Sequence, residues 1–204
     1  MAWFINHPLT IGHIPTSYET QKTPHEKLKV SCRYYMSQPV GTNDLPKSLF
    51  LRRSRKIIPD FFYAAGSILC VSQNLKEIIQ NFDKSEIVFL PFELFNSKRG
   101  DLRGTYYFMN FREPIDAVVV GSGNAKVTHE RFGGDGPDCF MVNRSMDGVC
   151  PEMQIRKSAI GKRHAWIDIQ QKIEKGIFVS DELMSYWEKK NIGNFEKIMY
   201  CEEV

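Results

Sequence analysis

One pattern occurs twice in the sequence, and it limits the possible folds more than any other feature. In each copy a short apolar run is followed by a serine, by a leucine three residues after the serine, and then by a second strand-like run. The copies comprise residues 68–71, Ser72 and Leu75, and residues 177–179, Ser180 and Leu183. A serine hydroxyl can accept a hydrogen bond from a free N–H in the first turn of a helix. We therefore predict a repeated strand–helix–strand unit with two serine-capped helices, although unrelated units could converge on the same pattern.

Apolar spacing and charge support both helices. Leu75, Ile78, Ile79 and Phe82 recur at the i, i+3, i+4 and i+7 positions that form one helix face. In the second copy, acidic residues fall in the first turn and basic residues in the last, where the helix dipole favours each charge. These residues are Asp181, Glu182, Lys189 and Lys190, and Asn191 or Gly193 can end the helix.

Much of the remaining chain has strand patterns. Residues 87–92 predict a strand in which Pro91 marks a sheet edge or a strand end, because proline has no N–H to donate. Residues 106–111 are apolar on both faces, as in a central strand. Residues 30–36 alternate as in a half-buried strand, and residues 60–65 allow a short helix. Together, these helix and strand patterns predict an α+β fold with a mixed or mainly antiparallel sheet.

Size and composition fit a chain with its own core. The 204 residues are 42% hydrophobic and 12% aromatic, which excludes a disordered chain. A folded chain of this mass buries roughly 70% of the surface that it exposes when unfolded. Residues 1–27 show no sustained period and predict an irregular arm with room for a short edge strand. We expect an N-terminal elaboration over residues 1–57 and one compact domain over residues 58–204.

The net charge, the cysteine spacing and the length of the apolar runs indicate the cellular environment and the kinds of partner to expect. A net charge of +3 does not demand a nucleic acid or an anionic membrane as partner. The five cysteines are widely spaced without a C-x-x-C, which favours reduced thiols over a disulfide framework or a zinc site. No signal peptide is visible, and no run approaches the ~20 apolar residues of a membrane helix. We expect a cytoplasmic protein that does not span a membrane.

The sequence makes no case for an enzyme. The glycine pattern at residues 121–124 lacks the third glycine of a dinucleotide loop, and residues 160–163 lack the P-loop pattern. Ser72 and Ser180 are predicted caps, because no nucleophile elbow surrounds them. The five histidines have no metal-ligand spacing. We expect no catalytic residues, no cofactor and no metal.

A dense basic run is the one strongly charged segment. Arg52, Arg53, Arg55 and Lys56 have no acidic residue between them, so they could meet phosphates or an acidic protein surface. Aromatic residues flank the run, but they are not interleaved with it as in single-strand binding sites. A nucleic-acid-binding or regulatory protein that uses residues 52–56 is therefore the alternative function, and a solvated segment without a ligand is also open.

An ordered set of short motifs resembles a bacterial immunity-protein family, formerly a domain of unknown function. The resemblance covers roughly residues 58–204, and its last motif is formed by Gly193 and Phe195. Its motifs are Leu69-Cys70-Val71-Ser72 with Leu75, Phe89-Leu90-Pro91, Tyr106-Tyr107 with Asn110, Ile115-Asp116-Ala117, Ile160-Gly161, His164-Ala165-Trp166, and the run from Phe178 to Leu183.

The resemblance implies an antitoxin that has no enzymatic activity. Members are assigned to the neutralisation of polymorphic toxins or toxins delivered by type VI secretion, and many lie beside nuclease-type toxins. The implied partner is a cognate toxin in the cytoplasm of the producing cell. A net charge of +3 does not suit a decoy that imitates nucleic acid, so steric occlusion is the better hypothesis.

Arginines in loops are the candidate interface residues, because arginine and aromatic side chains are frequent hot spots. The candidate segments are residues 52–56, 96–104 and 121–137. The partner-binding candidates are Arg52, Arg53, Arg55, Arg99, Arg103 and Arg131.

Overall fold

The computed structural model describes residues 1–6, 16–17, 45–52, 55–64, 68–84, 87–96, 100–122, 125–128, 139–142, 152–169, 176–192 and 196–204. Residues 30–36 and Gly193 lie outside these ranges. The chain divides into two units: unit 1 holds Met1–Asn6, Pro114–Lys190 and Glu196–Val204, and unit 2 holds His7–Glu113 and Asn191–Phe195. Each unit contains a mixed sheet and at least one helix, which confirms the α+β class. The boundary predicted between residues 57 and 58 stays a prediction.

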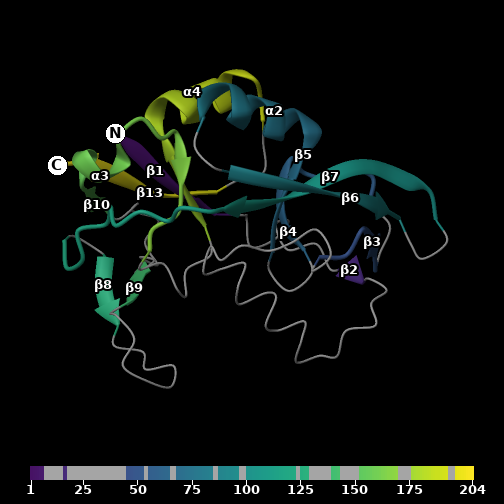
Figure 1. Cartoon of the computed structure of the whole chain (residues 1–204), viewed down its shortest axis with the longest axis horizontal. Coiled ribbons are helices and arrows are strands. Elements are labelled where there is room, and N and C mark those ends of the chain that lie inside the picture. Colours follow the sequence, from purple (N-terminus) through teal and green to yellow (C-terminus); the bar gives the residue numbers. More distant parts are fainter. Residues whose placement is uncertain are drawn as a thin grey trace. The chain divides into compact units, whose positions relative to one another are not determined.

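Unit 2 is built on a sheet with the strand order β2-β3-β6-β7-β5-β4 (Figure 1). The β3–β6 pair is parallel, and the other pairs are antiparallel. Its elements are β2 (Thr16–Ser17), β3 (Ser48–Leu51), β4 (Phe61–Ala64), β5 (Ile68–Ser72), α2 (Gln73–Phe82), β6 (Ile87–Phe95) and β7 (Leu102–Phe111).

This order confirms the central strand predicted over residues 106–111, whereas Pro91 lies inside β6 and not at a strand end. β7 lies between β6 and β5, which confirms it as a central strand. β3 pairs only with Glu93–Phe95 of β6, so Pro91 falls where β6 is paired through β7 alone within the described residues. Proline is tolerated there, because the ladder on the open side needs no donor.

The short helix expected over residues 60–65 is wrong. Residues 61–64 form β4, which pairs antiparallel with β5, and all four side chains are buried. A run of four apolar residues cannot be assigned to helix or strand by periodicity, and pairing with β5 decides the outcome here.

Unit 1 is built on a sheet with the order β10-β13-β1-β12-β11, beside a separate β8–β9 pair. The β10–β13 pair is parallel, and the other pairs of this sheet are antiparallel. Its elements are β1 (Ala2–Asn6), β8 (Ala125–Thr128), β9 (Cys139–Val142), β10 (Glu152–Ile155), α3 (Lys157–Ile160), β11 (Ala165–Trp166), β12 (Ile177–Ser180), α4 (Asp181–Lys189) and β13 (Glu196–Glu203).

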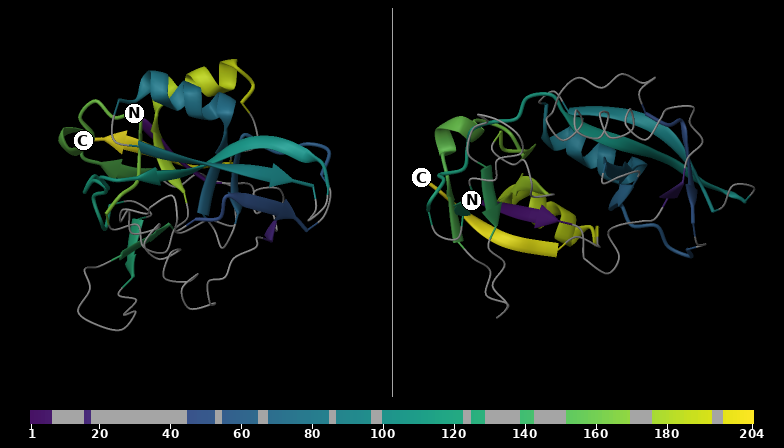
Figure 2. Two further views of the ribbon diagram at one scale, coloured as in Figure 1. Left: turned by 45° about the vertical axis from the view of Figure 1, so that its right-hand side comes forward. Right: turned by 90° about the horizontal axis from the view of Figure 1, so that it is seen from below.

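The N-terminal residues depart from the expected irregular arm. β1 is not an edge strand but the middle strand of the unit 1 sheet, hydrogen-bonded to β12 on one side and β13 on the other (Figure 2). Ala2, Phe4 and Ile5 are fully buried. A five-residue strand that is buried on both faces has no alternation to detect, so its place is decided by the two strands that enclose it.

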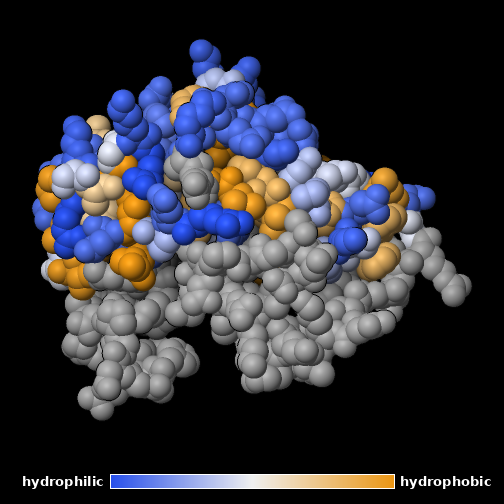
Figure 3. All heavy atoms as spheres, viewed as in Figure 1, coloured by the Kyte–Doolittle hydropathy of each residue, from blue (hydrophilic) through white to orange (hydrophobic). Residues whose placement is uncertain are grey.

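The two faces of β1 meet different partners. Ala2 and Phe4 join a core with Trp166, Phe178 and Met199. The Phe4 and Phe178 rings lie 4.8 Å apart between centroids, and Trp166 stacks on Phe178 at 5.7 Å. On the opposite face, α4 contacts β12 and β1, and its buried residues are Leu183, Met184 and Trp187. Hydrophilic side chains gather on the outward side of this helix (Figure 3). Both faces of the unit 1 sheet are therefore covered.

The repeated strand–helix–strand unit is confirmed as β5–α2–β6 and β12–α4–β13. In neither copy are the two strands neighbours. β7 lies between β5 and β6, and β1 lies between β12 and β13. The inserted strand is antiparallel to both, so the two strands of each repeat run parallel, as a helical crossover requires.

Candidate functional site

The two serines occupy the positions that the sequence predicts. Ser72 Oγ accepts a hydrogen bond from the Leu75 N–H, and Ser180 Oγ accepts one from the Leu183 N–H, both at 3.2 Å. Each serine has the extended backbone of an N-cap. Asn191 follows α4 with a φ of 49°, the left-handed conformation that often ends a helix.

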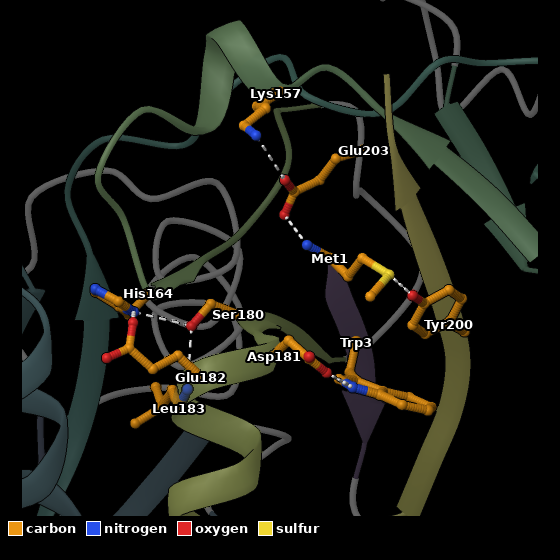
Figure 4. A network of polar contacts seen from close by, with 10 residues as sticks. All are labelled: Met1, Trp3, Lys157, His164, Ser180, Asp181, Glu182, Leu183, Tyr200 and Glu203. Atoms are coloured by element: carbon orange, nitrogen blue, oxygen red, sulfur yellow. Dashed lines mark hydrogen bonds and ion pairs between the residues drawn. The ribbon is translucent and has the colours of Figure 1, made fainter.

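Each capping serine is also in contact with a second polar side chain, which the sequence alone does not indicate. In unit 2 the Ser72 hydroxyl donates to an Asp60 carboxylate oxygen, and the Ser72 N–H donates to the Asp60 carbonyl at 2.9 Å. In unit 1, His164 Nδ1 lies 2.9 Å from Ser180 Oγ, and the Ser180 N–H donates to the His164 carbonyl at 2.9 Å (Figure 4). Asp60 and His164 thus hold the same position beside the cap of their unit.

The Ser180 cluster does not have the geometry of a catalytic triad. A triad uses one ring nitrogen of histidine for the serine and the other for the carboxylate. Here His164 Nδ1 is the atom close to Ser180 Oγ, and the same Nδ1 is 3.8 Å from Glu182 Oε2. The Glu182 side chain is 73% exposed. These contacts lie at the start of α4, where Ser180 Oγ caps the helix.

We expect Ser180→Ala to lower the free energy of unfolding by about 1 kcal/mol, the usual cost of an N-cap, because the Leu183 N–H loses its acceptor. Urea denaturation of the full chain measures the change. Ser180→Asp retains a capping oxygen and is the matched control, with a smaller expected loss. Equal losses in the two variants would contradict a capping role.

Further contacts tie the same strands to α4 and α3. The Trp3 indole N–H donates to Asp181 Oδ1 at 3.0 Å, and Trp3 meets the Tyr200 ring edge-on at 5.0 Å between centroids. Glu203 accepts from the Met1 amine and also lies 3.9 Å from Lys157 Nζ (Figure 4). These contacts join β1 to its neighbours at the exposed rim of unit 1.

A buried carboxylate holds the segment over residues 115–118. Asp168, 2% exposed, accepts from the Ala117 and Val118 N–H groups through Oδ2, at 2.8 and 2.7 Å. Ile115 forms backbone hydrogen bonds with Ile167 and Ile169 on either side of this residue. We call residues 115–118 the strap. The Asp168 carboxylate therefore holds the strap against the unit 1 core.

The structure describes three of the six predicted interface arginines. Arg52 is exposed directly after β3, Arg55 is half-buried, and Arg103 is exposed in β7. Arg53, Arg99 and Arg131 lie outside the described residues. All three described arginines belong to unit 2.

Folding brings two of the predicted segments together. Arg103 Nη2 donates to the Lys56 carbonyl at 2.7 Å, which joins the basic run to β7 across 47 residues of sequence. The flanking apolar side chains are exposed, Ile57 by 77% and Leu102 by 54%. We call Lys56 and Arg103, which this hydrogen bond joins, together with their chain neighbours Ile57 and Leu102, the Arg103 face. Its charges can be recognised in the sequence, but the exposure of its apolar residues cannot.

Other kinds of site find little support in the described residues. Within those ranges no three His, Cys, Asp or Glu side chains are grouped so that they could hold a metal ion. No helix among them is both long and apolar enough to cross a membrane. Cys70 and Cys201 are buried free thiols; burial raises the pKa of Cys70 well above its usual value and that of Cys201 to about 12. Neither thiol is therefore activated as a nucleophile.

Comparison with known families identifies one match. The model described as "Immunity protein family (Imm11)" matches residues 12–197, and no match was found among curated proteins. The match confirms the resemblance over residues 58–197 and also covers residues 12–57, where the sequence resembled no known family. Since the match covers most of the chain, the chain belongs to the Imm11 family of immunity proteins.

Proposed function

We propose that this protein binds a cognate secreted bacterial toxin in the cytoplasm of the producing cell and neutralises it by occlusion, without catalysing a reaction. The family match over residues 12–197 is the observation that carries the proposal, because an immunity protein implies a toxin as partner. A nuclease-type toxin, delivered as a polymorphic toxin or by type VI secretion, is the proposed target.

The Arg103 face is the proposed contact surface. It combines two exposed apolar side chains, Ile57 and Leu102, with the charges of Lys56 and Arg103. Exposed apolar groups next to arginine favour protein recognition, because apolar burial supplies affinity and the guanidinium supplies direction. Arg52, Arg53 and Arg55 would add charge to this surface, and Arg99 and Arg131 remain candidates elsewhere.

Charge suggests the chemistry of the partner. Residues 45–60 contain five basic side chains and one acidic side chain, Asp60. Asp60 is already hydrogen-bonded to Ser72, so it offers less to a partner. A fitting toxin surface would have an apolar hollow bordered by carboxylates. A decoy of nucleic acid would instead require carboxylates on this protein, which the Arg103 face lacks.

Co-expression with the toxin encoded next to this protein tests the proposal. We expect survival of the cells and co-purification of the two proteins. Mixing the purified protein with DNA and RNA at low salt is the parallel measurement, because binding that falls steeply with salt would favour the nucleic-acid alternative. Cell death together with no toxin binding would overturn the immunity proposal.

The contact surface is tested separately from the function. We expect Ile57→Asp to weaken toxin binding at least tenfold, because it places a carboxylate against the proposed acidic partner. Ile169→Asp is the matched control, since Ile169 is also exposed (54%) but belongs to unit 1. Calorimetry measures both affinities. Unchanged affinity of Ile57→Asp would exclude the Arg103 face while leaving the immunity role intact.

A further inference from the structure

The two main sheets share one topology. In unit 2 the order β3-β6-β7-β5-β4 begins with a parallel pair and continues with three antiparallel pairs. In unit 1 the order β10-β13-β1-β12-β11 begins with a parallel pair and continues with three antiparallel pairs. In both, the serine-capped helix connects the strands on either side of the middle one. β1 thus takes the place in unit 1 that β7 takes in unit 2.

The registers agree residue by residue. Ser72 precedes α2 and Ser180 precedes α4, so the two caps fix the alignment. Two residues before each cap, Cys70 pairs with Phe108 of β7, and Phe178 pairs with Phe4 of β1. On the other side of these strands, Cys70 pairs with Phe62 and Phe178 with Trp166. Phe4 and Phe108 are therefore equivalent positions, and both are fully buried.

The two middle strands differ in how the chain reaches them. β7 follows β6 directly, through the short connection between Phe95 and Leu102. β1 does not follow β13 in sequence but precedes all of unit 2, so residues 7–113 separate it from the rest of its own unit. Within unit 1 it is held by hydrogen bonds and packing to strands that are remote in sequence.

Gly176, immediately before β12, shows how closely β1 is fitted. A Cβ atom at this position would lie 2.5 Å from Phe4 Cζ and 2.6 Å from the Ile5 carbonyl oxygen. The third atom it would meet, Phe4 Cε2, also belongs to β1. The absence of a side chain at residue 176 is thus what allows β1 to approach β12.

We propose that the slot between β12 and β13 is a binding site for an extended apolar peptide, and that residues 2–6 of this chain are its ligand. The slot offers backbone hydrogen-bonding groups on both sides, as in recognition by strand addition. Side chains supply the selectivity: a small residue at position 2, an aromatic ring against Phe178 at position 4, and a buried apolar residue at position 5. In this view β1 completes the second copy of a duplicated unit as a donated strand.

Cleavage of the full chain tests the slot. A protease recognition sequence is inserted between residues 10 and 11, the folded protein is cut, and the product is passed through gel filtration without denaturant. We expect the fragment containing β1 to remain bound at one copy per molecule, as measured by mass spectrometry of the protein peak. An excess of synthetic peptide with residues 1–10, labelled at its C-terminus to leave the Met1 amine free for Glu203, should replace it over time.

Gly176→Ala, made in the same cleavable chain, is the decisive variant. Its Cβ meets only β1 among the nearest atoms, so we expect at least tenfold less fragment to be retained. Gly121→Asn is the control, because a Cβ there meets nothing within 4 Å and asparagine is one of the residues that adopt a positive φ, here 84°, most readily. Release of the fragment from the cut parent protein, with or without loss of the fold, would overturn the proposal. Full retention in Gly176→Ala would overturn the assigned position of the slot.

Discussion

Phe4→Ala should lower the free energy of unfolding of unit 1 by about 3–5 kcal/mol, the range for truncating a buried phenylalanine. The ring is fully buried and packs on Phe178 inside a core with Trp166 and Met199. Because the residue lies in the middle strand, the cavity opens at the centre of the sheet, where backbone movement cannot readily close it. Hydrogen exchange of the full chain, read by mass spectrometry, should show faster exchange in β12 and β13.

Phe108→Ala is the matched control for this prediction. Phe108 occupies the equivalent position in unit 2, where it pairs with Cys70 and stacks on Phe92 at 4.3 Å. We expect a loss of similar size, but with faster exchange in β5 and β6 instead. If Phe4→Ala left exchange in β12 and β13 unchanged, β1 would not be the strand that completes the unit 1 core.

Asp168→Ala should lower the free energy of unfolding by about 3 kcal/mol, because it leaves two buried N–H groups without their acceptor. Asp168 Oδ2 accepts from the Ala117 and Val118 N–H groups. Both residues are fully buried in the unit 1 core, so water cannot easily replace the carboxylate. Urea denaturation measures the change.

Asp116→Ala separates this effect from the loss of any nearby carboxylate. Asp116 lies on the same strap and pairs with Arg156 at 2.9 Å, but its side chain is 57% exposed. Exposed pairs contribute only about 0–1 kcal/mol, so we expect a much smaller loss. Comparable losses in the two variants would contradict the role assigned to the buried hydrogen bonds of Asp168.

Elements with local signals could be predicted from the sequence. Both capped helices have an apolar stripe and a serine at the correct offset, and both formed where expected. The strand patterns of β6 and β7 are also local, since runs of β-branched and aromatic residues and the proline all act within a few positions. Residues 61–64 show the limit: four apolar residues carry no period, and their pairing with β5 made them a strand.

The candidate site was predictable only in part. The basic run and the charge of Arg103 can be recognised in the sequence, although Arg103 was expected in a loop and lies in β7. Their contact cannot be recognised there, because the Lys56 carbonyl and the Arg103 guanidinium are 47 residues apart in sequence. The contact between His164 and Ser180 could not be predicted either, because the two residues meet only through the pairing of β11 with β12.

By itself, the sequence determined the class of fold, the two capped helices and the membership of an immunity-protein family, because short-range periodicity, capping chemistry and ordered motifs are all written locally. Only the tertiary structure decided where the first residues belong. β1 is a short apolar segment that could enter many sheets, and the strands that flank it, β12 and β13, lie near the opposite end of the sequence. Long-range strand pairing depends on the free energy of the assembled core, and no window of neighbouring residues contains that information.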